Sequence, residues 1–109
     1  MCQSLELKEI LRIETTFSSK GEASEFIEEL LREKLIACAQ SFPIESAYWW
    51  KGNIERSSEI LVILKLSKEN LNEVLKKFRG HPYEIPEITI INVKTTVDYG
   101  NWVESVKSI

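Results

Sequence analysis

The stretch of sequence richest in groups that could do chemistry is HPYEIPEI, residues 81–88. It holds the only histidine, His81, the glutamates Glu84 and Glu87, and two of the three prolines. Imidazole and carboxylate groups are common ligands of divalent cations, and proline restricts how a connector can bend. A rigid connector that presents titratable groups indicates a binding site. The other interpretation is a turn histidine whose ring caps a carbonyl or packs near Tyr83.

Cys38 is a further candidate metal ligand. It stands between Ala37 and Ala39, where a free cysteine commonly packs as a small apolar residue. Its thiolate would instead be a soft ligand for copper(I) or a similar ion. A divalent metal site needs three or four ligands. His81 and Cys38 alone are too few for a closed structural zinc site in one chain. A site built between subunits stays open.

Two further segments are notable, the aromatic AYWW (47–50) and an apolar run with the charged residues Glu59 and Lys65. In AYWW, strand alternation places Tyr48 and Trp50 on one side and Trp49 on the other. Such rings either fill a core or subunit interface or bind a ligand. Glu59 and Lys65 interrupt an apolar run, where a charge should be paired, and a cross-strand pair would explain them.

Several functions have no signature in the sequence. It has no Gly-rich phosphate loop, no CxxC pair and no HExxH motif, so we expect no enzyme. The net charge of −3, from 14 basic and 17 acidic residues, argues against a nucleic-acid partner. No apolar run approaches the ~20 residues of a membrane span, and the first residues lack a secretory pattern. We expect Cys2 and Cys38 to be reduced thiols in a cytoplasmic protein without a membrane partner.

Alternating elements must position these residues. Period-two patterns predict strands, and apolar residues at helical spacing predict helices. Ser19 and Glu22 form a capping box at the first helix, and Asp98 is expected to cap the last one. Gly52–Asn53 is expected to reverse the chain between two long strands. The predicted strands cover residues 9–17, 35–51, 54–66 and 87–94, and the predicted helices cover residues 18–34, 67–79 and a short segment from 98.

The order of these elements predicts a fold and an assembly. Residues 1–109 are expected to form one α+β domain with the β-α-β-β-α-β ferredoxin-like pattern, a long central hairpin and a C-terminal helix. Two helices cover only one face of a four-stranded sheet, and long hairpin strands leave backbone groups unpaired. Packing the bare faces together would resolve both problems, so we expect an oligomer.

Five short segments occur in a recognisable order along the chain. They are ACAQ (37–40), AYWWKGNIE (47–55), SEILVILK (58–65), HPYEIPEI (81–88) and DYGNWVESV (98–106). In these segments, and over nearly its whole length, the chain resembles the CutA family of divalent-cation tolerance proteins. The resemblance implies a ferredoxin-like subunit in a tight homotrimer and an association with tolerance of divalent metals, especially copper. The family's architecture is similar to that of PII signalling proteins, which implies as an alternative a trimeric signalling or scaffold protein without a physiological metal.

The resemblance can be carried over position by position. It implies a metal site at Cys38, His81 and Glu84, and an inter-subunit cleft with Tyr48, Trp50, Glu59, Lys65, Tyr83 and Glu87. Gly52, Pro82 and Pro86 match the family motifs as well. The chain departs from the usual family pattern at Ala39, Gln40, Pro43–Ile44 and Asn53.

The prolines give these residues a structural role. Pro82 and Pro86 are expected to hold the connector extended, so that His81, Tyr83 and Glu84 are presented at a subunit boundary. We expect three equivalent clefts in each trimer, which bind a divalent ion such as copper, a small ligand or a protein partner not yet identified.

Overall fold

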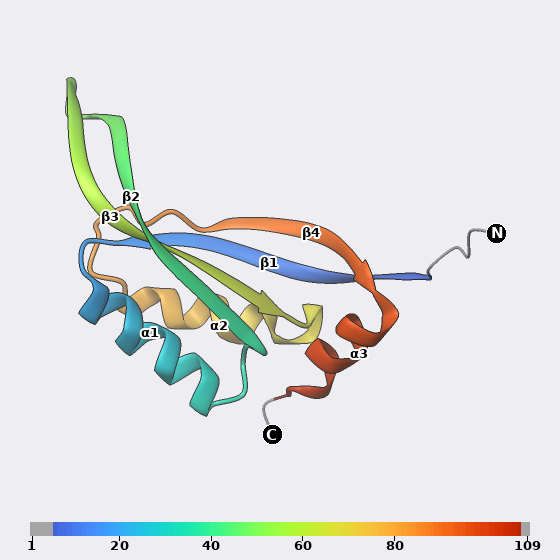
Figure 1. The fold of residues 1–109 in the computed structure, drawn as a ribbon. Helices are drawn as coiled ribbons and strands as arrows, with labels where there is room; N and C mark the ends of the chain where they lie inside the picture. Colours follow the sequence, from blue (N-terminus) through green and yellow to red (C-terminus); the bar gives the residue numbers. More distant parts are fainter. Residues whose placement is uncertain (1–5, 108–109) are drawn as a thin grey trace.

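The computed structural model describes residues 6–107 and has an α+β fold (Figure 1). Four strands form one antiparallel sheet in the order β2-β3-β1-β4, and the chain runs β-α-β-β-α-β before a last helix. The ferredoxin-like prediction is therefore confirmed. The elements are β1 (Leu7–Phe17), α1 (Lys20–Arg32), β2 (Cys38–Trp50), β3 (Asn53–Leu66), the short 3₁₀ helix η1 (Lys68–Asn70), α2 (Leu71–Lys77), the 3₁₀ helix η2 (Phe78–Gly80), β4 (Thr89–Thr96) and α3 (Val97–Ser105).

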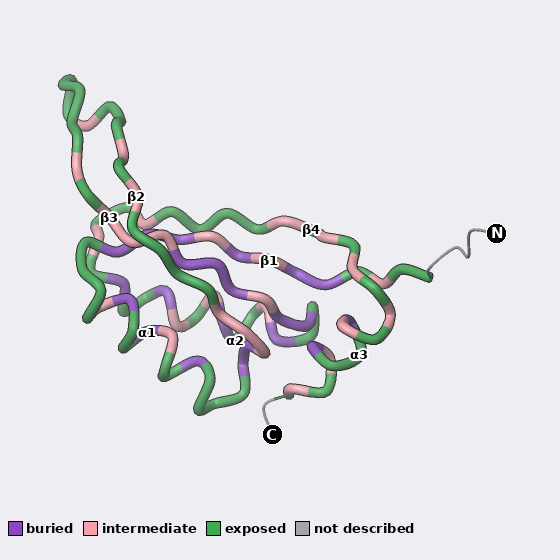
Figure 2. The backbone as a smooth tube through the Cα atoms, in the orientation of Figure 1, coloured by how far each residue is buried: buried purple, intermediate pink, exposed green. Residues whose placement is uncertain are grey.

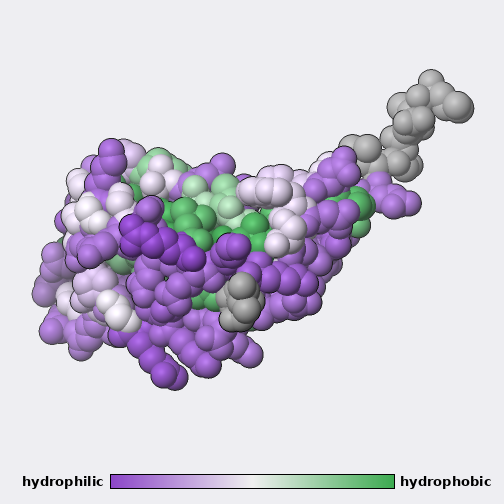
Figure 3. Space-filling view, turned by 90° about the horizontal axis from the view of Figure 1, so that it is seen from below, coloured by the Kyte–Doolittle hydropathy of each residue, from purple (hydrophilic) through white to green (hydrophobic). Residues whose placement is uncertain are grey.

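The hydrophobic core lies between the sheet and the helices α1 and α2, as the buried central strands in Figure 2 show. Alternate residues of β1 and β3 point to it, and Ile13 pairs with Leu64 in the middle of the sheet. The face of the molecule seen from below Figure 1 is mostly hydrophilic, with an apolar strip in its middle (Figure 3). The buried core residues are Leu11, Ile13, Phe17, Ala23, Phe26, Leu30, Leu35, Ile36, Val62, Leu64, Leu66, Val74 and Phe78.

The residue predicted to cap the N-terminus of α1 is correct, and the one predicted for α3 is wrong. The Ser19 hydroxyl accepts a hydrogen bond from the Glu22 backbone N–H at 3.2 Å, which confirms the cap of α1. Thr96, and not Asp98, caps α3, since its hydroxyl accepts from the Tyr99 N–H at 3.4 Å. A cap residue has an extended backbone, which Thr96 has, whereas Asp98 already lies in the first helical turn.

The reversal between β2 and β3 is one residue earlier than predicted. The two turn residues are Lys51 and Gly52, with φ angles of 51° and 81°, and Asn53 already pairs with Trp50. A two-residue hairpin turn with positive φ at both positions matches the right-handed twist of its strands. Glycine adopts this conformation without steric cost, whereas Lys51 adopts it as an uncommon exception.

The hairpin extends far beyond the rest of the sheet. The β1–β3 pairing ends at Phe17 and Ile60, so residues 44–59, here called the arm, pair only with each other. The arm leaves the body of the molecule at one end (Figure 1). Seven residues of each strand reach about 23 Å at ~3.3 Å per residue. The radius of gyration is 15.7 Å, against ~13 Å for a compact chain of this length.

Helix α3 lies against the end of the sheet that is remote from the arm. The Lys65 Nζ stands 5.8 Å from the centroid of the Tyr99 ring, and the Lys8 Nζ lies 2.9 Å from a carboxylate oxygen of Glu104. Both lysines alternate with residues of the core, so they point to the other face of the sheet. Part of this second face is therefore covered by α3.

The rest of the second face is open. Phe42 pairs with Leu61 there, and its side chain is 48% exposed. The edge strand β4 is also largely exposed (Figure 2), and it begins at Thr89 and not at Glu87 as predicted. The part of the chain from residue 6 to residue 107 thus leaves apolar sheet surface without a cover, as the oligomer prediction requires. The trimer itself stays a prediction.

Candidate functional site

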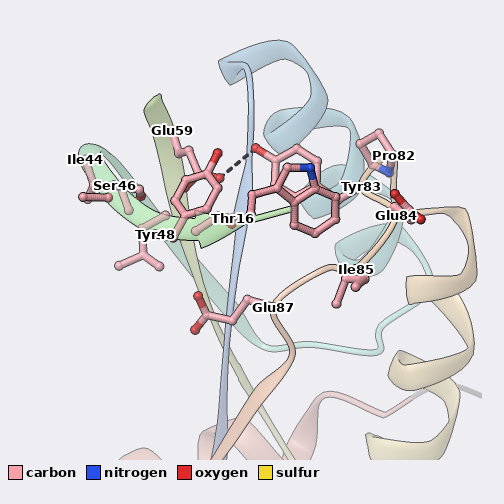
Figure 4. Close-up of a pocket in the computed structure, with 13 residues that line it drawn as sticks. Thr16, Ile44, Ser46, Tyr48, Glu59, Pro82, Tyr83, Glu84, Ile85 and Glu87 are labelled. Atoms are coloured by element: carbon pink, nitrogen blue, oxygen red, sulfur yellow. Dashed lines mark hydrogen bonds between the residues drawn. The ribbon is translucent and has the colours of Figure 1, made fainter. Parts of the chain in front are cut away.

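A cleft of about 670 Å³ lies between the arm and the connector that joins η2 to β4 (Figure 4). Six of the nine residues predicted for a metal site or a cleft line it, and they come from β2, β3 and the connector. The fold thus brings these six residues together within one chain, whereas the inter-subunit cleft stays a prediction. These six residues are Tyr48, Trp50, Glu59, Tyr83, Glu84 and Glu87.

Tyr83 joins the connector to the arm. Its hydroxyl donates a hydrogen bond of 2.8 Å to the Glu59 carboxylate, drawn as a dashed line in Figure 4. Burial raises the pKa of Tyr83 well above its usual value, and the neighbouring Glu59 adds to the shift. The phenol therefore stays a donor at neutral pH. The cross-strand pair predicted for Glu59 is wrong, because its hydrogen-bond partner is this neutral hydroxyl of the connector.

His81 supports the wall of the cleft from behind. Its side chain is buried, its Nε2–H donates to the Thr16 carbonyl oxygen at 2.9 Å, and its Nδ1 accepts from the Tyr83 N–H at 3.0 Å. The ring stacks on Phe17, with centroids 4.3 Å apart, and meets the edge of the Tyr83 ring. The interpretation of a histidine that caps a carbonyl and packs near Tyr83 is confirmed.

These contacts define the protonation state of the imidazole. One nitrogen must carry a proton for Thr16, and the other must be free to accept from Tyr83. Burial lowers the pKa of His81 below its usual value, although the Thr16 carbonyl and the more distant Glu22 act in the opposite direction. His81 is therefore neutral near pH 7, and it fixes the backbone of Tyr83.

The three predicted metal ligands do not meet within one chain. Cys38 lies opposite Lys65 in the sheet. The His81 ring instead contacts Thr16, which lies opposite Leu61. Lys65 and Leu61 are four residues apart on β3, which is about 13 Å along the strand. Burial and the neighbouring Cys38 thiol raise the pKa of Tyr99, the ring that covers this end.

A metal site therefore cannot be read from one subunit. Among residues 6–107, no three His, Cys, Asp or Glu side chains are grouped so that they could hold a metal ion. Cys38 forms no disulfide with any described residue, and Cys2 lies outside them. Both His81 nitrogens are engaged with the backbone, so ligation through either would break a hydrogen bond. Glu84 is exposed and free of this restriction.

The carboxylates of the connector differ in their surroundings. The Glu87 carboxylate accepts a 2.9 Å hydrogen bond from the Thr89 hydroxyl, and both Glu84 and Glu87 are exposed. Carboxylate oxygens suit magnesium, calcium and manganese, and copper(II) also accepts oxygen ligands. The donor set of the cleft is hence incomplete in one chain but chemically suited to a divalent cation.

Sequence reasoning missed several residues that line the cleft. Ile85 is 71% exposed between the two prolines of the connector, and Thr16 is the last residue but one of β1. An apolar residue at the exposed tip of a rigid connector is a signal that could have identified Ile85. The other missed lining residues are Ile44, Ser46, Ala47 and Leu61.

The fold and the cleft define a small ferredoxin-like protein with an aromatic and acidic groove at the base of a protruding hairpin. Comparison with protein families is more specific. The model of the CutA1 divalent ion tolerance protein family matches residues 11–106, and the chain therefore belongs to this family.

Individual relatives agree with this assignment. The divalent-cation tolerance protein CutA of Thermotoga maritima is 38% identical over 100 residues, which are 89% of this chain and 99% of that protein. The CutA structure from Synechococcus elongatus superposes with a TM-score of 0.85 at 31% identity and covers 93% of this chain and 95% of its own. The structure from Archaeoglobus fulgidus, described as a periplasmic divalent cation tolerance protein, has a TM-score of 0.84 at 32% identity over 91% and 98% of the two chains.

Proposed function

We propose that this protein acts in divalent-cation tolerance as a homotrimer that binds the cation, copper in particular, at clefts shared between subunits. The observation that carries the proposal is the cleft itself, in which Glu84 and Glu87 stand exposed opposite the arm. Copper(II) has the highest affinity of the first-row divalent ions for a given set of ligands, which supports copper as the cation.

The subunit boundary is proposed because one chain leaves both the site and the sheet incomplete. A divalent ion needs more ligands than the described residues of one subunit gather. The exposed Phe42 and the self-paired arm offer a surface on which a second copy can pack. A neighbour at this surface would lie beside the cleft and could supply the missing ligands.

Metal titration tests the proposal. Copper(II) and zinc are titrated calorimetrically into the native protein and into the variant Glu84→Gln/Glu87→Gln, which keeps side-chain size but removes two charges. We expect the double variant to lose at least about tenfold in affinity, since each carboxylate lost removes a charged ligand. The matched control is Glu25→Gln/Glu45→Gln, whose two exposed carboxylates lie outside the cleft. Equal affinities in all three proteins, or no binding to the native one, would contradict the proposal.

A second candidate function is that of a trimeric signalling or scaffold protein. The outer side of the arm favours it, because Trp49 and Ile54 form a cross-strand pair and are 72% and 60% exposed. A partner that still binds after the metal is removed with a chelator, and that is lost in Trp49→Ser, would support this alternative. Unchanged partner binding in Trp49→Ser would refute the role of this surface.

The cellular location is part of the proposal. Reduced cysteines support a cytoplasmic protein, and Cys38 is unpaired within the described chain. No helix in residues 6–107 is long and apolar enough to span a membrane. Fractionation of cells that express the protein would decide the location, and recovery in a periplasmic extract would contradict it.

A further inference from the structure

The charged side chains that line the cleft are all carboxylates. Three carboxylates line it, those of Glu59, Glu84 and Glu87, and none of its described lining residues is Lys, Arg or His. In the view of Figure 4, Glu59 lies on one side of the cleft with Tyr48, and Glu84 lies on the other with Pro82. These carboxylates would repel an anionic ligand and attract a cationic one.

Aromatic rings make up the second part of the surface. Tyr48, Trp50 and Tyr83 line the cleft together with apolar side chains such as Ile44 and Ile85. Ring faces attract ammonium and guanidinium groups, and Trp50 already does so, since the Lys51 Nζ lies 5.6 Å from its ring centroid. Apolar walls of this kind also favour a ligand that has a hydrocarbon body.

Part of this surface is held in a fixed geometry. The backbone of Tyr83 donates to His81, its ring packs edge-on against the imidazole at a centroid distance of 5.0 Å, and its hydroxyl donates to Glu59. The ring and the carboxylate are thus ordered before any ligand arrives. Such preorganisation reduces the entropy that binding would otherwise cost.

We propose that the cleft binds a small organic cation, a primary ammonium or guanidinium group on an apolar body of about six carbon atoms. The volume of about 670 Å³ lies within the usual range for small-molecule sites. The carboxylates would balance the positive charge of the ligand, and the aromatic and apolar side chains would pack against its hydrocarbon body. This organic cation differs from the metal ion proposed above. A metal ion needs several coordinating atoms around it, whereas the organic cation does not and therefore needs no contribution from a second chain.

The test uses three probes of equal chain length, titrated calorimetrically into the full chain in its native oligomeric state near pH 7 with EDTA present. Hexylamine is a cation at this pH, hexan-1-ol is neutral and hexanoate is an anion. We expect hexylamine to bind at least about tenfold more tightly than hexan-1-ol, with hexanoate weakest. Equal binding of hexylamine and hexan-1-ol, or no binding of hexylamine, would overturn the proposal.

Two variants locate the binding within the cleft. Glu84→Gln/Glu87→Gln should weaken hexylamine at least about tenfold and leave hexan-1-ol unchanged, because only the charge is removed. Trp50→Leu should weaken hexylamine by about fivefold by removing the ring face. The control Glu25→Gln/Glu45→Gln should bind as the native protein does, since Glu45 alternates with the lining residues Ile44 and Ser46 and points to the other side of the arm.

The remaining outcomes separate this proposal from others. Hexylamine binding that is unchanged in both cleft variants would place the site elsewhere and refute the inference. Binding of oligolysine without binding of hexylamine would assign the cleft to a basic protein segment and would also refute it. Because EDTA is present, hexylamine can bind when copper and zinc fail in the metal titration, and in that case only the metal proposal is contradicted.

Discussion

At the scale of single residues, His81 shows how a functional and a structural interpretation can start from the same sequence signal. The residue was singled out because it is the only histidine and stands before a proline. In the structure both of its ring nitrogens form hydrogen bonds with the backbone, at Thr16 and Tyr83. The sequence could not predict this arrangement, because Thr16 is 65 positions away and no local pattern connects the two.

The buried imidazole leads to a prediction about pH. Burial lowers the pKa of His81 in the folded protein below that of the unfolded chain, which is ~6.5. The unfolded state then binds more protons below that pH, so the free energy of unfolding falls as the pH decreases. We expect native protein to lose stability between about pH 7 and about pH 5.5, as measured by urea unfolding.

The control for this prediction is His81→Gln, which cannot titrate in this range. It removes packing and lowers stability at every pH, but its stability should change less between the two pH values than that of the native protein. If native protein and variant show the same pH dependence, it arises from groups other than His81 and the prediction is wrong.

At the scale of elements, local signals were sufficient where neighbouring residues decide the structure. The period of the apolar residues located the four strands and three α-helices that residues 6–107 form, and Ser19 caps α1 as predicted. The errors lie at element boundaries: the hairpin turn and the starts of β4 and α3 shift by one or two residues, β2 begins at Cys38 and not at residue 35, and the helix predicted over 67–79 is α-helical only over Leu71–Lys77, with a 3₁₀ helix at each end. Such boundaries depend on backbone geometry that composition alone does not define.

The turn of the hairpin gives a prediction at this scale. Gly52 has a φ of 81°, which a residue with a Cβ adopts at a cost, although open space surrounds the position. We expect Gly52→Ala to destabilise the protein by about 1 kcal/mol in urea unfolding, through backbone strain alone. Gly21→Ala is the control, because it lies in α1 with negative φ and has no close neighbour, so it should be neutral or stabilising. If Gly52→Ala unfolds at the same urea concentration as the native protein, the prediction is wrong and the hairpin can adopt a turn of another type.

At the scale of the whole molecule, the cleft is where sequence reasoning came closest to function. The family resemblance implies an inter-subunit cleft with Tyr48, Trp50, Glu59, Tyr83 and Glu87 and a metal ligand at Glu84, and the fold brings these six residues together within one chain. Of the other three, Cys38 and His81 belong to the predicted metal site and Lys65 to the predicted cleft, and Cys38 and Lys65 lie at another part of the sheet. Family motifs mark residues under a shared constraint, but do not show whether that constraint is a ligand or the packing of the core.

The uncovered sheet face gives the prediction that concerns assembly. Phe42 is 48% exposed on this face, so a copy of the chain that packs there would bury it. We expect the native protein to sediment as the proposed trimer and Phe42→Glu as a monomer in sedimentation velocity, because a charge would be buried without a partner. Leu31→Glu is the matched control, as Leu31 is 39% exposed and lies on α1, which covers the opposite face of the sheet. A native protein that sediments as a folded monomer would contradict the assembly.

The solitary imidazole has a practical consequence for solution work. Since the chain contains one histidine, its Cε1 proton gives a single resonance in a proton NMR spectrum, without isotope labelling or assignment. That nucleus lies between the two nitrogens that hold Thr16 and Tyr83 in place. Its chemical shift is thus a built-in reporter of whether the connector remains docked when a ligand enters the neighbouring cleft.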